Sequence, residues 1–391
     1  MAKRFSLLFV LILFFFNSLA QREDENILPQ ISTKKDSASV AKVESKNFRI
    51  TPFIAPSVSP EVGLMVTLGG LMSFKLDKED KKIQSSSIPF SVGYSTTGAI
   101  IANFRPSLFF KNDKNRLMGD LWIKDMPDNY WGIGYDAGKS PSMPDSTTEY
   151  QRLWYQIFLK YSHRFGEYFY AGLLLDYNAT SATDPGQRLL DDPNYQTYGA
   201  DIDNISAGLL VQYDSRDITV NAYKGLFLEL SSNFYSSAAR GKPTYNVIIM
   251  DYRQYKQIKR PGSTLAWQAK TRIATGKVPW PEMSQIGTPF DLRGYRWGRY
   301  RDVHSLFGIA EYRYMFMRKT PRKDGDMMSR FGLAGWLAAG TVMADFGDMR
   351  NWLPNAGIGF RFEVQKRMNA RIDYGIGNDS NSVYISFNEA F

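Results

Sequence analysis

In the stretch "LAWQAKTRI" (265–273), larger apolar residues and polar or charged residues fall on opposite faces of an extended chain. Leu265 and Trp267 fall on one face of an extended chain, and Lys270 and Arg272 fall on the other. A soluble sandwich of two sheets shows the same period but does not usually bury charges on its inner face, whereas the wet interior of a membrane barrel accommodates them. The stretch therefore predicts one strand of a β-barrel that spans a membrane.

The composition of the 391-residue chain agrees with this prediction. Aromatic residues make up 15% of the sequence, yet the mean hydropathy is only −0.34. Barrel strands alternate apolar with polar residues and so average out as hydrophilic. The chain has no cysteine, which excludes disulfides and acylation of a cysteine at a cleavage site. A net charge of +9 on an exported chain favours contact with anionic lipid headgroups over nucleic acid.

The first residues have the form of an export signal. Lys3 and Arg4 precede a short apolar run that ends in small residues, so we expect residues 1–20 to be a signal peptide. A membrane anchor is the alternative, but the apolar run is short for a span. Residues 21–46 are polar and predict a flexible periplasmic segment, and 47–391 the barrel domain.

The same alternation recurs in sixteen segments. They lie at 47–57, 62–75, 86–94, 98–110, 116–125, 150–163, 167–178, 203–214, 224–236, 244–256, 263–275, 305–317, 329–342, 355–365, 368–377 and 382–391. An even number places both chain ends in the periplasm, and the long connections 126–149, 179–202 and 276–304 then all lie outside. The predicted fold is all-β, a 16-stranded antiparallel transmembrane β-barrel in the outer membrane of a Gram-negative bacterium.

The chain finishes with "SVYISFNEAF" (382–391). Ile385, Phe387 and Glu389 share one face of the expected last strand, and this face should meet lipid. A terminal phenylalanine on such a strand resembles the signal by which outer-membrane barrels are recognised for insertion. Phe387 and Phe391 are therefore expected to be the C-terminal insertion signal.

Seven aromatic residues near expected strand ends suggest girdles at the two lipid headgroup layers. The simpler alternative is that aromatic residues favour strands in general. These residues are Trp122, Tyr130, Trp131, Trp154, Tyr155, Trp280 and Trp352.

The connection before the twelfth strand contains "DLRGYRWGRYRD" (291–302), a dense run of charge interrupted by two glycines. Glycines are expected where a loop turns tightly or its backbone docks closely against another surface. The run includes Leu292, Arg293, Gly294 and Tyr295 in sequence. With this motif the chain resembles the BamA/TamA type of outer-membrane barrel, the bacterial surface antigen superfamily, whose hallmark is [V/I/L]-R-G-[F/Y] in the same loop.

The resemblance implies that this sixth extracellular loop folds inward into the barrel. Its arginine would pair with acidic residues on the next strands, and Glu311 is the expected partner of Arg293. The family's aspartate in the following strand is replaced by Ala338, so Glu311 is expected to hold the arginine alone.

Two further matches extend the resemblance over roughly 48–391. "YDSRDITVNAYKG" (213–225) is similar to a periplasmic turn motif of the family, and "SPEVG" (59–63) matches near the start. Ala222 stands where the family has proline in that turn. The residues carrying the turn motif are Asp214, Arg216, Asp217 and Gly225.

Family members that assemble or secrete proteins carry periplasmic POTRA modules, for which 21–46 leaves no room. The chain is therefore expected to be a barrel-only member. A separate periplasmic or lipoprotein partner would replace the modules, and client outer-membrane proteins and outer-membrane lipid are the other expected partners.

Catalysis is not expected. The two histidines, His163 and His304, have no evident nucleophile partner, and no catalytic or metal-binding motif occurs. We expect no catalytic residue, no metal and no cofactor, although some outer-membrane barrels are lipases or proteases.

The expected function is outer-membrane biogenesis. In the family, the first and last strands form a weakly paired seam that helps proteins or lipids enter the membrane. A transport channel for a small solute or lipid is one alternative, and a structural anchor of a surface complex is another.

Overall fold

The computed structural model describes residues 48–59, 62–77, 79, 83–139, 147–237, 244–322 and 325–391. These residues belong to one compact unit, Lys46–Phe391. The expected signal peptide and periplasmic segment lie outside the described residues.

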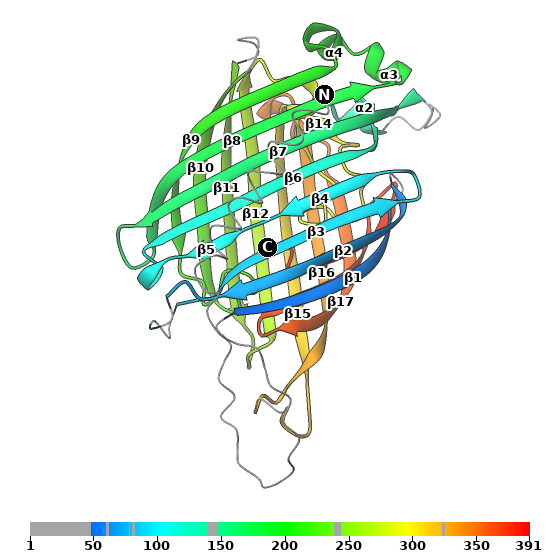
Figure 1. Ribbon diagram of the computed structural model, residues 1–391. Coiled ribbons are helices and arrows are strands. Elements are labelled where there is room, and N and C mark those ends of the chain that lie inside the picture. Colours follow the sequence, from blue (N-terminus) through cyan, green and yellow to red (C-terminus); the bar gives the residue numbers. More distant parts are fainter. Residues whose placement is uncertain are drawn as a thin grey trace, which may run out of the picture. The chain divides into compact units, whose positions relative to one another are not determined.

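Antiparallel strands form the wall of this unit (Figure 1). They are β1 (Phe48–Ser59), β2 (Gly63–Phe74), β3 (Ser86–Ser95), β4 (Ile100–Phe104), β5 (Ser107–Phe109), β6 (Asn115–Asn129), β7 (Glu149–Arg164), β8 (Phe169–Thr183), β9 (Asp201–Asp214), β10 (Gly225–Ser237), β11 (Thr244–Gln257), β12 (Ser263–Gly276), β15 (His304–Met317), β16 (Met328–Met343), β17 (Leu353–Gln365), β18 (Met368–Ile376) and β19 (Asn381–Phe387).

Each wall strand pairs with the next along the chain. The sheet has 17 strands, but β4 and β5 both pair with β6 and are two parts of one wall strand. The break falls at Pro106, which has no N–H to continue a ladder. Counted as wall strands, the described residues form sixteen, which confirms the predicted 16-stranded barrel.

The two faces of the wall differ as the alternation predicts. Along β15, Tyr312 and Tyr314 are exposed, whereas Glu311 and Arg313, which alternate with them, are buried. Along β9, Leu209 and Val211 are exposed, whereas Asn204, Ser206 and Gln212 on the other face are buried. Polar side chains therefore face the interior and apolar ones the outside, the reverse of a soluble protein.

The connections carry the short elements. They are α2 (Tyr135–Lys139), α3 (Gln187–Leu190), α4 (Pro193–Tyr198), η1 (Lys111–Asp113), η3 (Trp280–Glu282), η4 (Phe346–Asp348), and the small strand pair β13 (Ser284–Gln285) and β14 (Arg301–Asp302). In the described part of the chain, no helix has the length and apolar character needed to cross a membrane.

The three long connections pack together at one end of the wall. Trp280 is fully buried there, with its ring 5.7 Å from that of Tyr130 and 5.9 Å from that of Tyr195. Its Nε1 donates a hydrogen bond to the carbonyl oxygen of Gly199 at 3.1 Å. An aromatic core thus covers this end of the wall. The packing agrees with the prediction that the three connections lie on the same side of the membrane.

The prediction that the seven aromatic residues form girdles at the lipid headgroup layers is wrong for most of them. Tyr130, Trp131 and Trp280 are buried in the packed connections. Trp122 and Trp154 face inward, and their rings lie 4.5 and 4.6 Å from the Lys124 ammonium. Contacts with buried partners decided these positions, so closeness to a strand end did not identify residues that face lipid. Of the seven residues, Trp352 has an exposed side chain and Tyr155 is partly exposed.

The last strand is shorter than predicted, because β19 ends at Phe387. Asn388 has φ +62° and its N–H donates to the Asn369 carbonyl at 2.7 Å. The chain then turns inward, and Glu389 and Phe391 are buried. The prediction that Glu389 shares the lipid-facing row is therefore wrong. Inside, its carboxylate has arginine partners, whereas in hydrocarbon it would have none.

A seam separates β1 from β19. Within the described strands, β1 forms a ladder with β2 alone and β19 with β18 alone. Side chains close the wall here: the rings of Phe53 and Phe387 lie 4.2 Å apart. Gln365 also donates to Thr51 Oγ1 at 2.7 Å and accepts from Ser73 Oγ at 2.6 Å.

Candidate functional site: an interior charge cluster

The connection that contains the arginine motif docks against the inner face of β18. Gly294 has φ +119°, a conformation that favours glycine, and a Cβ there would lie 2.7 Å from the main-chain carbon of Gly375. A Cβ on Gly375 would in turn overlap the main chain of Arg293. The two glycines therefore allow the loop backbone to lie directly against the wall.

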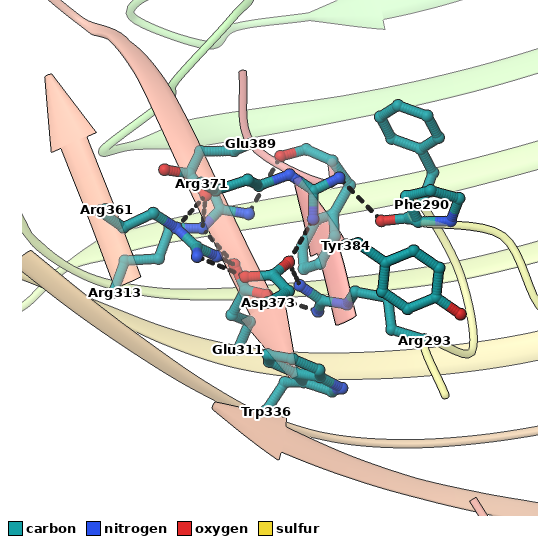
Figure 2. A network of polar contacts seen from close by, with 12 residues as sticks. Phe290, Arg293, Glu311, Arg313, Trp336, Arg361, Arg371, Asp373, Tyr384 and Glu389 are labelled. Atoms are coloured by element: carbon teal, nitrogen blue, oxygen red, sulfur yellow. Dashed lines mark hydrogen bonds and ion pairs between the residues drawn. The ribbon is translucent and has the colours of Figure 1, made fainter. Parts of the chain in front are cut away.

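This close approach buries the Arg293 side chain completely. Its Nη1 donates to Asp373 Oδ2 at 2.7 Å, and its Nη2 donates to Glu311 Oε2 at 2.5 Å (Figure 2). The guanidinium carbon lies 3.5 Å from the ring centre of Trp336. The Asn355 amide donates to the Arg293 carbonyl. A planar guanidinium fits such two-sided binding, which a lysine would not reproduce.

Six further charged groups complete what we call the interior charge cluster. With Arg293 its members are Glu311, Arg313, Arg361, Arg371, Asp373 and Glu389, all buried. They come from β15, β17, β18 and the turn after β19 (Figure 2).

Each carboxylate in the cluster has at least two arginine partners. Glu311 Oε1 accepts from Arg313 Nε at 2.7 Å, in addition to its bond with Arg293. Asp373 accepts from Arg361 at 2.5 Å and also from Arg371. Glu389 Oε2 accepts from Arg361 Nε at 2.9 Å and lies 3.6 Å from Arg313 Nε. Four arginines thus face three carboxylates, and each carboxylate has oppositely charged partners.

Through Arg293 the cluster fastens the loop to β15 and β18, and ion pairs of Arg361 join these two strands to β17 and to the turn after β19. Burying so many charges is costly, and removing one partner from a buried pair typically costs about 3–5 kcal/mol. Every carboxylate that contacts these arginines accepts hydrogen bonds from them. The arrangement is therefore suited to restraining the loop mechanically, because Arg293 of the loop is paired with Glu311 and Asp373 of the wall.

The structure differs from the sequence prediction in the number of acids that hold Arg293. Glu311 was expected to act alone because Ala338 replaces an aspartate, but Asp373 binds the other side of the guanidinium. The second carboxylate comes from β18 instead of β16. Alternation in "RIDYGIG" (371–377) puts Arg371 and Asp373 on one polar face, and this signal was available in the sequence.

The other motif residues lie around the same contact. Leu292 is buried in the interior core, and the Tyr295 hydroxyl donates to the Pro354 carbonyl at 2.7 Å. Phe391 lies in the same core beside Arg313, whose guanidinium carbon is 4.9 Å from its ring centre. Phe387 is at the seam instead, so the two terminal phenylalanines contact different surroundings.

The turn motif forms a second arrangement, at the end of the wall away from the three long connections. Asp214 accepts from Arg216 Nε at 2.8 Å and from Arg116 Nη1 at 2.5 Å. Asp217 accepts from the N–H of Tyr223 at 2.9 Å. Gly225 has φ +108° and closes the turn. All four predicted motif residues lie in this one turn.

Arg367 ties this turn to the connection between β17 and β18. Its Nη2 lies 2.8 Å from Asp217 Oδ2, and its guanidinium stacks 3.5 Å above the ring centre of Tyr223. Tyr223 is almost fully buried. Burial raises the pKa of Tyr223 to about 12, an effect that the Arg367 cation opposes.

We expect this tyrosine to make the turn sensitive to alkali. Because its folded pKa lies above its unfolded value near 10, its contribution is complete below pH 10 and disappears as the pH rises through about 12. The protein should lose about 1–2 kcal/mol over this window that a Tyr223→Phe variant keeps. Unfolding in denaturant at pH 9 and pH 12 tests this, and equal losses in both proteins would contradict it.

The two histidines take no part in either arrangement. His163 Nδ1 lies 2.7 Å from Asn115 Oδ1, and His304 Nδ1 accepts from the Ala274 N–H at 3.3 Å. Within the described ranges, no group of three acidic or histidine side chains is arranged to hold a metal ion.

Known proteins were compared by sequence and by structure. No protein-family model and no curated protein matches the sequence. Solved structures do match, and BamA from Haemophilus ducreyi lacking POTRA domains 1–3 has a TM-score of 0.51 over 88% of this chain. In fold, the chain resembles BamA.

The BamA structure is 12% identical in sequence, and the match covers 69% of its length. CdiB from Acinetobacter baumannii has a TM-score of 0.50 and 11% identity, over 87% of this chain and 65% of CdiB. The chain thus spans about two thirds of the length of either structure. Because the match to BamA includes most of the wall, the likeness concerns the barrel fold as a whole.

Proposed function

We propose that this protein is a non-enzymatic outer-membrane biogenesis barrel of the BamA/TamA type. It assists the insertion or assembly of proteins or lipids in the outer membrane of a Gram-negative bacterium. The observation that carries the proposal is the seam in a wall whose fold resembles BamA.

The physical basis is the cost of an unpaired strand edge in hydrocarbon. Each main-chain N–H or carbonyl without a partner there costs several kcal/mol, on the order of 2–7, so a group that satisfies it is favoured. Side chains, chiefly Phe53 against Phe387, close the seam in place of a ladder. Opening it therefore breaks few hydrogen bonds.

The interior charge cluster has a supporting role in this proposal. By fixing the loop to β15, β17 and β18, it keeps the last strands rigid while the seam beside β19 changes. The role of the motif is to hold the loop in place against the wall. Its residues are Leu292, Arg293, Gly294 and Tyr295. A separate periplasmic or lipoprotein partner delivers clients to the barrel.

Depletion of the protein in its own host tests the function. We expect lower levels of a subset of outer-membrane proteins, or altered outer-membrane lipid, measured by mass spectrometry of purified membranes. Expression of the intact chain from a second locus should restore the normal profile, and a chain with Asp373→Asn should not. An unchanged profile after full depletion would rule the function out.

A further inference from the structure

The short turns between the wall strands carry exposed positive charge. Those that follow β2, β5, β7, β9, β11, β15 and β17 lie at the end of the wall away from the three long connections, which we call the turn end. The described acids exposed at this end are Glu79, Glu167 and Asp217, and Arg367 already pairs with Asp217 at 2.8 Å. The exposed cations outnumber these acids, and they include Lys111, Lys114, Lys259, Arg318, Lys319 and Lys366.

The opposite end, which includes the long connections, has the reverse balance of charge. Its exposed cations among the described residues are Lys139, Lys277 and Arg350. Its exposed acids are more numerous, and they include Asp136, Asp184, Asp191, Asp345, Asp348 and Asp379. The wall is therefore positive at its turn end and negative at the opposite end.

The cations of the turn end are available to an anion from outside the molecule. Lys111, Lys319 and Lys366 form no ion pair within the described part of the chain. An exposed ammonium group without an acid beside it attracts external anions over about 10 Å at 0.1 M salt. Several such groups on neighbouring turns form one positive surface.

Exposed aromatic side chains lie at the same end. Phe165 is 75% exposed and Phe169 is 61% exposed, in and directly after the turn that follows β7. The Arg260 guanidinium carbon lies 4.6 Å from the ring centre of Tyr314, a residue of the outward row of β15. At a membrane surface, aromatic rings lie at the level of the headgroups, and long cationic side chains extend beyond them to the phosphates. The turn end has both kinds of side chain in this order.

We propose that the turn end binds anionic phospholipids through the phosphates of their headgroups. Its exposed lysine and arginine side chains are the binding groups, and the acidic opposite end repels the same lipids. The proposal goes beyond the biogenesis function and does not depend on it.

An acidic protein is the other kind of anion that a positive surface attracts. A protein that docks on the turns alone would leave the rings of Phe165 and Phe169 in water, whereas a lipid leaflet covers these rings and also reaches the cations. The outward position of the rings therefore favours lipid as the partner.

Local quenching of a fluorophore by labelled lipid tests the proposal. Because the chain has no cysteine, Thr320→Cys labels the turn end and Asn351→Cys labels the opposite end, both at exposed positions. The full chain is reconstituted in phosphatidylcholine vesicles that contain a small, equal fraction of nitroxide-labelled phosphatidylglycerol or phosphatidylcholine. At position 320 we expect phosphatidylglycerol to quench about fivefold more than phosphatidylcholine, roughly the attraction of one cation to an anionic surface. At position 351 we expect no such preference.

Two variants with the same net charge separate a local effect from a general one. Lys111→Gln, Lys319→Gln and Lys366→Gln together should abolish the preference at position 320. Lys139→Gln, Lys277→Gln and Arg350→Gln together are the matched control at the opposite end and should leave it unchanged. Salt at about 1 M, where the screening length is about 3 Å, should also remove the preference in the parent.

Four outcomes would overturn the inference. They are equal quenching by the two lipids at position 320, an equal preference at position 351, a preference that survives the three turn-end changes, and a loss of preference that is the same in both variants. An acidic protein that co-purifies from native membranes and shields position 320, with no lipid preference in its absence, would assign the surface to a protein partner instead.

Discussion

Replacing Asp373 with asparagine is expected to release the loop 277–303 from the barrel wall. Asp373 contacts three arginines, and without its charge these guanidinium groups share only Glu311 and Glu389. Uncompensated buried charge costs about 3–5 kcal/mol. Thermal unfolding in detergent should occur at a clearly lower temperature, and trypsin should cut the native barrel after Arg296 and Arg299.

Asp120→Asn is the matched control for this change. Asp120 forms an ion pair with Arg105 at 2.7 Å, but the two side chains are 36% and 38% exposed. Pairs of this kind contribute about 0–1 kcal/mol, so stability and trypsin resistance should stay close to those of the parent. A protein with Asp373→Asn that resists trypsin as well as the control does would show that the cluster does not hold the loop.

Adding one methyl group at Gly375 should have a related effect for a steric reason. Its Cβ would overlap the main chain of Arg293, which cannot move unless the whole loop withdraws. We expect Gly375→Ala to cost up to about 3 kcal/mol and to open the same trypsin sites. Limited proteolysis followed by mass spectrometry of the fragments measures both the site and the rate of cleavage.

Gly335→Ala provides the comparison within the same sheet. A Cβ there would meet its nearest atom, the carbonyl oxygen of Gly357, at 3.8 Å, an ordinary contact. This variant should behave as the parent does. If the two alanine variants lose stability equally, the close backbone approach is not what positions the loop.

Much of the wall could be predicted from the sequence, because a strand and its two faces follow from the alternation of neighbouring residues. Alternation such as that in 265–273 indicates both the strand and the face that meets the interior, and the structure has all sixteen wall strands within a few residues of their expected bounds. Local alternation says nothing about partners across the interior. It therefore identified Glu311 and Arg313 as neighbours on one face but not Asp373 as the second acid.

The end of the chain shows where this reasoning fails. Alternation continues through "SVYISFNEAF", so the pattern extends the last strand to Phe391. The turn at Asn388 depends instead on a distant group, the Arg361 guanidinium that binds Glu389. Trp280 is a second case: its contacts with Tyr130, Tyr195 and the Gly199 carbonyl hold it among the packed connections, whereas its place near a strand end predicted a headgroup layer. In each case a long-range contact outweighed a local preference.

The members of the interior charge cluster are far apart in the sequence, from Arg293 to Glu389. Arg293 precedes its partner Asp373 by 80 residues, and Glu389 lies two residues before the last residue given, Phe391. A chain shortened before Asp373 would leave Arg293 with Glu311 as its one carboxylate partner among the described residues. Closure of the interior charge cluster therefore depends on the C-terminal strands, because Asp373 and Glu389 both lie near the end of the chain.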